Sequence, residues 1–357
     1  MSSMIRKEVR GLKGYHLASV PHRIKLNQNE SPWDLPAPLK DKIVERLRKA
    51  DWNRYPSPFC DPLRAKIAER EGWSFDGVVV SGGSNVLIQV VTIAASVNGK
   101  ILTVTPSFSL YELEGAILGN RVAAVPLGKD DFSFPRDAFL KRMKALRPKI
   151  VFLANPNAPT GNLFEEDDLL AVVKKAPGIV VIDEAYYPFS GRTMAPYLKT
   201  HKNLVIVRTL SKAFSLGGVR LGYLLADPVL AGEFRKVILP FSVGILPQIV
   251  GEAALEESAY GNRVVTEIIE GRATIYEGLK SLPGLTVYPS DANYVLFQSP
   301  KAQEIFSGLV AKEILIRNVS MKGLPNALRV SVGTNEENRL FLEAMSSISL
   351  TLRVKSS

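Results

Sequence analysis

The sequence of 357 residues contains very little cysteine and histidine. Its single cysteine, Cys60, excludes an intramolecular disulfide framework and is typical of a reducing compartment, so we expect a cytoplasmic protein. The three histidines, His16, His22 and His201, do not have the spacing of metal ligands. We therefore expect no metal site.

Long apolar segments are also absent. No window approaches the uninterrupted run of about 18 apolar residues that is typical of a membrane-spanning helix. The first ten residues, MSSMIRKEVR, lack the apolar core of a secretory signal. We expect neither a signal peptide nor a membrane partner.

The formal net charge of +10 suggests a nucleic-acid partner at first sight. The basic residues are scattered, however, and clusters such as residues 141–144 are typical of solvated helix faces. Basic and aromatic side chains are not interleaved as they are in proteins that stack bases. We therefore expect no nucleic-acid partner, and a basic surface also suits small anionic substrates.

Between residues 77 and 226, short apolar runs rich in β-branched residues alternate with segments that are mostly long enough for a helix. Strands that are apolar throughout are typical of a mainly parallel sheet covered by helices on both faces. The sequence thus predicts an α/β domain with a seven-stranded sheet. The predicted strands are residues 78–80, 101–105, 122–125, 150–154, 179–182, 204–207 and 221–226.

The remaining segments predict a smaller α+β domain. An irregular N-terminal arm ends near residue 38, and the apolar spacing then predicts a helix over residues 38–50. We expect a large domain at residues 45–245, and a small domain with the N-terminal arm from residues 1–44 and 246–357. The other predicted elements are a long helical segment at 246–282, strands at 285–288, 294–297, 314–317 and 328–332, and a final helix from about residue 335.

Ligands of parallel sheets bind beyond the carboxyl ends of the strands, so the residues that follow each strand matter most. After strand 179–182 comes Asp183-Glu184-Ala185-Tyr186. An ATPase would need a phosphate-binding loop as well, and neither Gly-Lys pair, at 99–100 or 128–129, fits its pattern. Asp183 is then either a helix cap or the partner of a buried cationic ring nitrogen, as pyridoxal phosphate requires.

After strand 204–207 comes Arg208-Thr209-Leu210-Ser211-Lys212, with Arg220 a few residues later. The hydroxyls of Thr209 and Ser211 and the guanidinium of Arg220 are suited to a phosphate dianion. Lys212 is either a further phosphate ligand or an amine that condenses with an aldehyde.

Two further turns follow predicted strands. Residues 81–85, Ser-Gly-Gly-Ser-Asn, precede a predicted helix, and the free N–H groups of a helix N-terminus bind phosphate. Residues 155–161, Asn-Pro-Asn-Ala-Pro-Thr-Gly, form a rigid turn from which Asn157 is able to present its amide to a ring oxygen. Each turn, taken alone, is equally compatible with an ordinary connection.

Together the motifs N-P-N-x-P-T-G, D-E-A-Y, T-L-S-K-A-F and G-x-R-x-G-Y occur in an order that resembles fold-type I pyridoxal-phosphate (PLP) aminotransferases. Within that fold, the chain is most similar to the histidinol-phosphate aminotransferase family, from about residue 15 to residue 334. The segments that carry this closer resemblance are residues 25–30, 53–56, 317–320 and 328–334.

The resemblance implies roles for individual residues. Lys212 is the lysine that forms an imine (aldimine) with the cofactor and moves the substrate proton, and Asp183 pairs with the ring nitrogen. The other implied contacts are Tyr186 and Asn157 to the phenolic oxygen, Phe108 stacked on the ring, Ser84, Asn85, Thr209, Ser211 and Arg220 on the cofactor phosphate, Tyr55 reaching that phosphate from a second subunit, and Tyr15, Arg317 and Arg329 on the anionic end of the substrate.

Three positions depart from the family pattern. Ser84-Asn85-Val86 replaces the usual small-Asp-Glu, Ala158 replaces an Asn, and Phe108 replaces a Tyr. A phosphate contact through backbone N–H groups is insensitive to the first change. Phe108 retains the stacking of a tyrosine but not any contact of its hydroxyl.

The function implied by the resemblance is transfer of an amino group between L-histidinol phosphate and 2-oxoglutarate in histidine biosynthesis, by a homodimer. Three alternatives stay open: an aromatic aminotransferase, a threonine-phosphate decarboxylase-like enzyme, and a non-catalytic regulator with this fold. Retention of both Lys212 and Asp183 argues against the regulator. Arg317 has a second interpretation as part of a surface ion pair.

Overall fold

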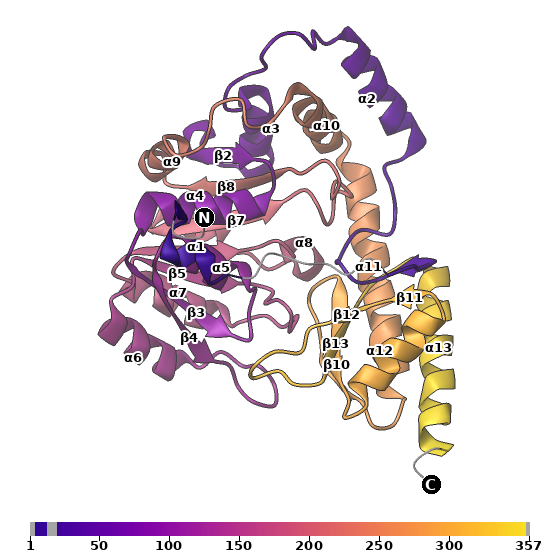
Figure 1. The fold of residues 1–357 in the computed structure, drawn as a ribbon. Helices are drawn as coiled ribbons and strands as arrows, with labels where there is room; N and C mark the ends of the chain where they lie inside the picture. The colour runs from indigo at the N-terminus through magenta and orange to yellow at the C-terminus, as the bar shows by residue number, and fades with distance from the viewer. Residues whose placement is uncertain (1–3, 13–19, 355–357) are drawn as a thin grey trace.

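The computed structural model describes residues 4–12 and 20–354, and its central feature is a seven-stranded sheet (Figure 1). The strand order is β2-β8-β7-β6-β5-β3-β4, with β8 antiparallel to both of its neighbours and every other pair parallel. This confirms the mainly parallel sheet expected from the sequence. The strands are β2 (Val78–Ser81), β3 (Lys100–Thr105), β4 (Arg121–Pro126), β5 (Ile150–Ala154), β6 (Ile179–Asp183), β7 (Leu204–Thr209) and β8 (Gly222–Ala226).

Helices pack on both faces of this sheet (Figure 1). They are α3 (Asp61–Glu71), α4 (Ser84–Ala95), α5 (Leu110–Ile117), α6 (Arg136–Leu146), α7 (Glu166–Lys175), α8 (Tyr187–Ser190) and α9 (Pro228–Arg235), with a short α1 (Lys7–Arg10) and 3-10 turns η2 (Phe75–Gly77) and η3 (Ala195–Lys199). Alternate residues of one strand enter different hydrophobic clusters. Val181 packs with residues of α4, α5 and α9, whereas Val180 and Ile182 pack with residues of α3, α6 and α7. Burial on both faces explains why these strands are apolar throughout.

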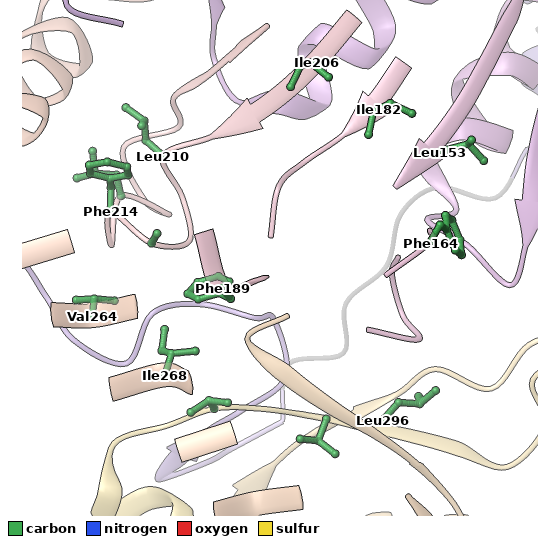
Figure 2. Close-up of a cluster of buried hydrophobic side chains, with 14 of the residues drawn as sticks. Leu153, Phe164, Ile182, Phe189, Ile206, Leu210, Phe214, Val264, Ile268 and Leu296 are labelled. Atoms are coloured by element: carbon green, nitrogen blue, oxygen red, sulfur yellow. The ribbon is translucent and has the colours of Figure 1, made fainter. Parts of the chain in front are cut away.

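The long helix α11 (Ser258–Lys280) joins this sheet to the C-terminal part of the chain. With 23 residues it is about 35 Å long. Figure 2 shows part of the hydrophobic cluster to which α11 and the sheet both contribute: Val264 and Ile268 of α11, Phe189 of α8, and Ile182 and Ile206 of the central strands. Full burial of each such side chain contributes roughly 1.5–3 kcal/mol.

The second part of the molecule contains a four-stranded antiparallel sheet with the order β12-β13-β10-β9, and a two-stranded parallel sheet of β1 and β11. Pairing of β1 with β11 places the N-terminal segment against the C-terminal part. The elements are β1 (Ile24–Lys25), α2 (Ala37–Lys49), α10 (Ile245–Glu256), α11, β9 (Thr286–Val287), β10 (Tyr294–Gln298), α12 (Ala302–Ala311), β11 (Ile314–Leu315), β12 (Arg317–Asn318), β13 (Ala327–Ser331) and α13 (Asn335–Val354).

Two predicted elements of this part differ from the structure. The predicted helical segment 246–282 is two helices, because Glu257 leaves the helical region with φ −105° and ψ 58°. The predicted strand 314–317 is also divided, because Leu315 pairs with Lys25 in one sheet and Arg317 pairs with Arg329 in another. A change of pairing partner leaves no mark in an apolar pattern.

The predicted domain boundary between residues 44 and 45 falls inside helix α2. Ion pairs join α2 to α10, among them Arg46 to Glu256 and Lys42 to Glu257. The division into domains stays a prediction. Within the part of the chain that the structure describes, no helix has both the length and the apolar character to cross a membrane.

Candidate active site

The residues singled out by the sequence follow β2, β5, β6 and β7, whose carboxyl ends meet at one edge of the sheet. This edge is where a parallel sheet positions ligands. Ser84 follows β2, Asn157 follows β5, Tyr186 follows β6 and Lys212 follows β7. The parallel topology therefore brings together residues from four distant segments.

The first feature of this edge is a close approach of backbone and guanidinium at the start of α4. Gly83 has φ +104°, and a Cβ there would lie 2.6 Å from Arg220 Nη2. A Cβ on Gly222 would lie 2.3 Å from the Ser84 nitrogen. Only glycine fits at either position, so the N-terminus of α4, with Ser84 and Asn85 in its first turn, stays next to Arg220.

Hydroxyl groups complete this cradle. Arg220, in the left-handed region with φ +59°, donates from Nη1 to Gly217 O at 3.0 Å and to Ser211 Oγ at 3.5 Å. Ser211 N donates to Thr209 Oγ1 at 3.1 Å. A cation, two hydroxyls and a helix N-terminus form a donor set suited to a phosphate dianion.

Lys212 lies beside this cradle. Its Nζ donates to Gln28 O at 3.2 Å, in the N-terminal segment. Burial, and then the nearby charge of Arg329, lower the pKa of Lys212 to about 8. An amine that loses its proton near neutral pH is a nucleophile, which favours condensation with an aldehyde over a role as a permanent phosphate ligand.

Asp183 ends β6 and is buried without a cation beside it among the described residues. Its Oδ2 accepts from Tyr111 Oη at 2.9 Å and its Oδ1 accepts from Ala185 N at 3.1 Å. Burial raises the pKa of Asp183 to about 6, against the lowering effect of these hydrogen bonds. A cationic ring nitrogen would supply the missing charge.

Sequence reasoning missed Tyr111, although a signal was present. It lies three residues after Phe108, at a spacing that places two side chains on one face of a helical turn. The two rings meet edge to face with centroids 5.6 Å apart. Phe108, the predicted stacking residue, is thus held by the tyrosine that also binds Asp183.

Asn157 is buried and its amide is fully engaged within the protein. Its Nδ2 donates to Pro106 O at 3.0 Å and to Thr160 Oγ1 at 2.7 Å, and its Oδ1 accepts from Ser107 Oγ at 2.9 Å. A contact of Asn157 with a ring oxygen would have to replace one of the two donated bonds. The structure therefore gives Asn157 a role in fixing the turn, and its contact with a ligand stays a prediction.

Tyr186 follows β6 of the large sheet, whereas the two arginines belong to strands β12 and β13 of the small sheet. Tyr186 Oη accepts from Asn29 Nδ2 at 2.9 Å, a contact that sequence reasoning missed. Arg329 donates from Nη2 to Asn27 O at 3.1 Å, and its register partner on the next strand is Arg317. Directly opposed residues of antiparallel strands share a face, so the two arginines lie side by side.

One predicted residue of the described chain, Tyr55, is not brought into this cluster. The Tyr55 side chain is 84% exposed and rests on the ring of Phe241, with centroids 4.8 Å apart. Tyr15 lies outside the described residues. The oxygens Asn27 Oδ1 and Asn293 Oδ1 are buried near the site and accept no hydrogen bond in the described structure.

A second buried charged group lies next to the site and was not predicted. The guanidinium of Arg208 is bound by Glu184, which accepts from Nη2 at 2.8 Å, and by Glu71. It also lies 3.7 Å from the centroid of the Tyr187 ring. This network joins β6, β7, α3 and α8 behind the residues that face the edge.

Comparison with known proteins identifies the family. A sequence model described as aminotransferase class I and II matches residues 21–345 of the 357-residue chain. The chain belongs to the class I and II aminotransferase family. This family depends on PLP, and the chain is accordingly a PLP-dependent aminotransferase.

Individual relatives in this aminotransferase family agree with that assignment. The histidinol-phosphate aminotransferase of Deinococcus radiodurans is 39% identical over 347 residues, which cover 96% of each chain. Histidinol-phosphate aminotransferase 2 of Nitrosococcus oceani is 38% identical, with 97% of each chain covered. Among solved structures, the histidinol-phosphate aminotransferase of Sinorhizobium meliloti in complex with pyridoxal-5'-phosphate superposes with a TM-score of 0.88 at 23% identity, covering 98% of each chain.

The site of this aminotransferase fits PLP. The cradle between Gly83, Ser84 and Arg220 depends on glycine, because a Cβ on Gly83 would collide with Arg220, and its donors suit the cofactor phosphate. Asp183 is a buried carboxylate that lacks a cation, and Lys212 is an amine with a lowered pKa. Each group therefore has the chemistry that one end of the cofactor requires.

Proposed function

We propose that this aminotransferase moves an amino group between L-histidinol phosphate and 2-oxoglutarate, as a step of histidine biosynthesis. The observation that carries the proposal is the pairing of Arg317 with Arg329 on adjacent strands. Arg329 is close enough to Lys212 to lower the pKa of the lysine. A phosphate monoester carries nearly two negative charges at neutral pH, which two neighbouring arginines match. Relatives at 39% and 38% identity are named histidinol-phosphate aminotransferase, which supports the proposal.

In this proposal the amine of Lys212 would hold the cofactor and would then act as the proton carrier. Bound PLP supplies an electron sink that makes the substrate Cα–H acidic. The Lys212 amine, with a pKa of about 8, takes this proton as a general base and returns it as a general acid. Asp183 keeps the ring nitrogen protonated, and the α4 cradle with Arg220 holds the phosphate in place.

Arg329 serves both substrates in turn, because each has an anionic group attached next to the carbon that bears the reacting amine or carbonyl. Arg317 adds the second charge that favours a phosphate over a carboxylate. Tyr15 is proposed to complete this anion site. An aromatic aminotransferase would not need Arg317 next to Arg329, whereas a threonine-phosphate decarboxylase-like enzyme would use the same pair.

A cytoplasmic homodimer is part of the proposal. Tyr55 is 84% exposed, and its ring rests on that of Phe241, which is also exposed, so that the two form a small apolar patch. Such a patch is typical of a protein interface, and Tyr55 is proposed to reach the cofactor phosphate of the second subunit. Sedimentation should give a dimer, and a fully active monomer would contradict this part.

The experiment is a titration followed by visible absorbance. The purified protein loaded with PLP should be yellow, should bleach on addition of histidinol phosphate, and should recover on addition of 2-oxoglutarate. The parallel additions are phenylalanine and threonine phosphate. If the yellow protein responds to either of these and not to histidinol phosphate, the substrate assignment changes to the one that responds. A protein that stays colourless with PLP would overturn the role of Lys212.

A further inference from the structure

Asn29 is an unusual residue at the edge of the site. It is 2% exposed and adopts a left-handed conformation with φ +54°, which asparagine tolerates better than most residues. Every polar group that it carries has a partner. Its backbone N donates to Ser331 Oγ at 2.8 Å, and its backbone O accepts from Asn293 Nδ2 at 3.0 Å.

The side chain of Asn29 has a defined direction. Ser331 Oγ donates to Asn29 Oδ1 at 3.2 Å, which leaves Nδ2 to face Tyr186 Oη at 2.9 Å. An amide nitrogen only donates hydrogen bonds. Tyr186 therefore accepts from Asn29, and its own O–H hydrogen points elsewhere.

The groups around Tyr186 come from several elements. The ring of Tyr294 on β10 meets the Tyr186 ring edge to face, with centroids 5.2 Å apart. Arg329 on β13 and Asp183 on β6 are the charged groups that act on the Tyr186 hydroxyl, one lowering and one raising its pKa. Among its hydrogen bonds in the described structure, the one from Asn29 sets the direction of the hydroxyl.

We propose that Asn29 is a positioning residue that keeps the Tyr186 hydroxyl aimed as a donor at the phenolic oxygen of PLP. The inference rests on the proposed function and on the role that the family resemblance implies for Tyr186 as the ligand of that oxygen. Asn29 is anchored to Ser331 of the small sheet and to Asn293, so the arm at residues 26–31 and the small sheet together set this donor.

The test measures the pH midpoint at which the absorbance of the bound cofactor changes. A donor on the phenolic oxygen stabilises its negative charge and lowers this midpoint. Asn29→Gly removes the side chain but keeps a residue that accepts the left-handed conformation. We expect the midpoint to rise by about 0.5–1 pH unit, because the hydroxyl is no longer held in one direction.

The matched control is Asn326→Gly, which changes another left-handed asparagine, exposed and remote from the site. It should leave the midpoint unchanged. Asn29→Asp replaces the donor with an acceptor that attracts the Tyr186 hydrogen, so it should raise the midpoint further than Asn29→Gly. If Asn29→Gly does not fold, Ser331→Ala removes the anchor of Oδ1 instead and should also raise the midpoint.

The decisive comparison is made in a Tyr186→Phe background. If Asn29 acts through the hydroxyl, Asn29→Gly adds no further shift once the hydroxyl is gone. An equal shift in both backgrounds, or no shift in the parent, would overturn the inference. A parent protein without cofactor absorbance would instead defeat the proposed function, and a parent that binds PLP but ignores histidinol phosphate leaves this test intact.

Discussion

Two carboxylates that are neighbours in sequence, Asp183 and Glu184, are both buried but differ in their partners. Glu184 lies 2.8 Å from the guanidinium of Arg208, whereas the donors to Asp183 among the described residues are Tyr111 and the Ala185 backbone. A buried carboxylate is costly without a cation, so a protein that keeps one without its partner gains from a ligand that brings the charge. The folded chain itself supplies a cation to Glu184, whereas Asp183 requires the cofactor to supply one.

The two pKa shifts agree with this contrast in their causes. Burial raises the pKa of Glu184, but the charge of Arg208 and the hydrogen bond from Met194 N oppose that rise. Burial also raises the pKa of Asp183, to about 6, and there only neutral donors oppose it. The difference lies in whether the compensating cation is part of the chain.

The largest expected effect is on stability, from Arg208→Met. This change leaves Glu184 and Glu71 buried without their common cation, and breaking a buried pair in this way costs about 3–5 kcal/mol. Urea denaturation of the cofactor-free protein should show this loss in the free energy of unfolding. A loss below about 1 kcal/mol would contradict the conclusion that Glu184 is stabilised by its ion pair in a way that Asp183 is not.

Asp183→Asn should have the opposite profile. Catalysis should fall by about 10²–10³ in kcat/KM, because a neutral amide no longer keeps the ring nitrogen charged. The free energy of unfolding of the cofactor-free protein should not fall at neutral pH, since no internal ion pair is lost and the carboxylate charge that burial disfavours is removed. Steady-state kinetics and urea denaturation on the same preparation would separate the two effects, and a large loss of stability would contradict the assignment.

The pH dependence of stability sharpens the comparison. The pKa of Asp183 in the folded, cofactor-free protein is raised to about 6, above its unfolded value near 4. The folded state therefore binds the extra proton, and the stability that it contributes is present below pH of about 4 and is lost as pH rises through about 6. Thermal denaturation from pH 4 to 7 should show this loss in the parent and not in Asp183→Asn, and bound PLP should also reduce it.

The smallest effects are expected from removing the hydroxyl of either of two tyrosines, one that donates to Asp183 and one that donates to Glu71 of the Arg208 network. Tyr111→Phe removes a donor from Asp183 and should lower kcat/KM by about 3- to 10-fold, the equivalent of one hydrogen bond. Tyr223→Phe removes a donor from Glu71 and should lower stability by about 1 kcal/mol with little change in kcat/KM. Steady-state kinetics and urea denaturation of the two variants should therefore show a loss of kcat/KM mainly in Tyr111→Phe and a loss of stability mainly in Tyr223→Phe. Equal losses of both quantities in the two variants would contradict the contrast between Asp183 and Glu184.

Much of the fold was predictable because its signals are local. The apolar β-branched runs predicted all seven strands of the main sheet, and the glycines and prolines after them predicted the turns. The division of the strand near Ile316 was not predictable, because it depends on pairing partners that are distant in sequence. The helix break at Glu257 was not predicted either.

For the site, the residues after each strand were found from motif order, and the structure places Lys212, Asp183 and Arg220 at one edge of the sheet. Their roles as ligands of cofactor and substrate stay predictions. Tyr111 carried a detectable signal through its spacing from Phe108. Asn29 lies in the segment 25–30 that carries the family resemblance, but its role could not be predicted, because its conformation and its partner Tyr186 are set only when the N-terminal arm meets the small sheet.

The sequence by itself determined the strands, the turns that end them and the reactive side chains in those turns, because hydrophobic periodicity and turn chemistry act over a few residues. The tertiary structure alone decided which buried polar groups have a hydrogen-bond or ion-pair partner. Tyr111 meets Asp183 across 72 positions, Arg208 meets Glu71 across 137, and Asn29 meets Tyr186 across 157. Hydrogen bonds and ion pairs have no period along the chain, so only the packed structure shows that Glu184 has its cation and that Asp183 does not.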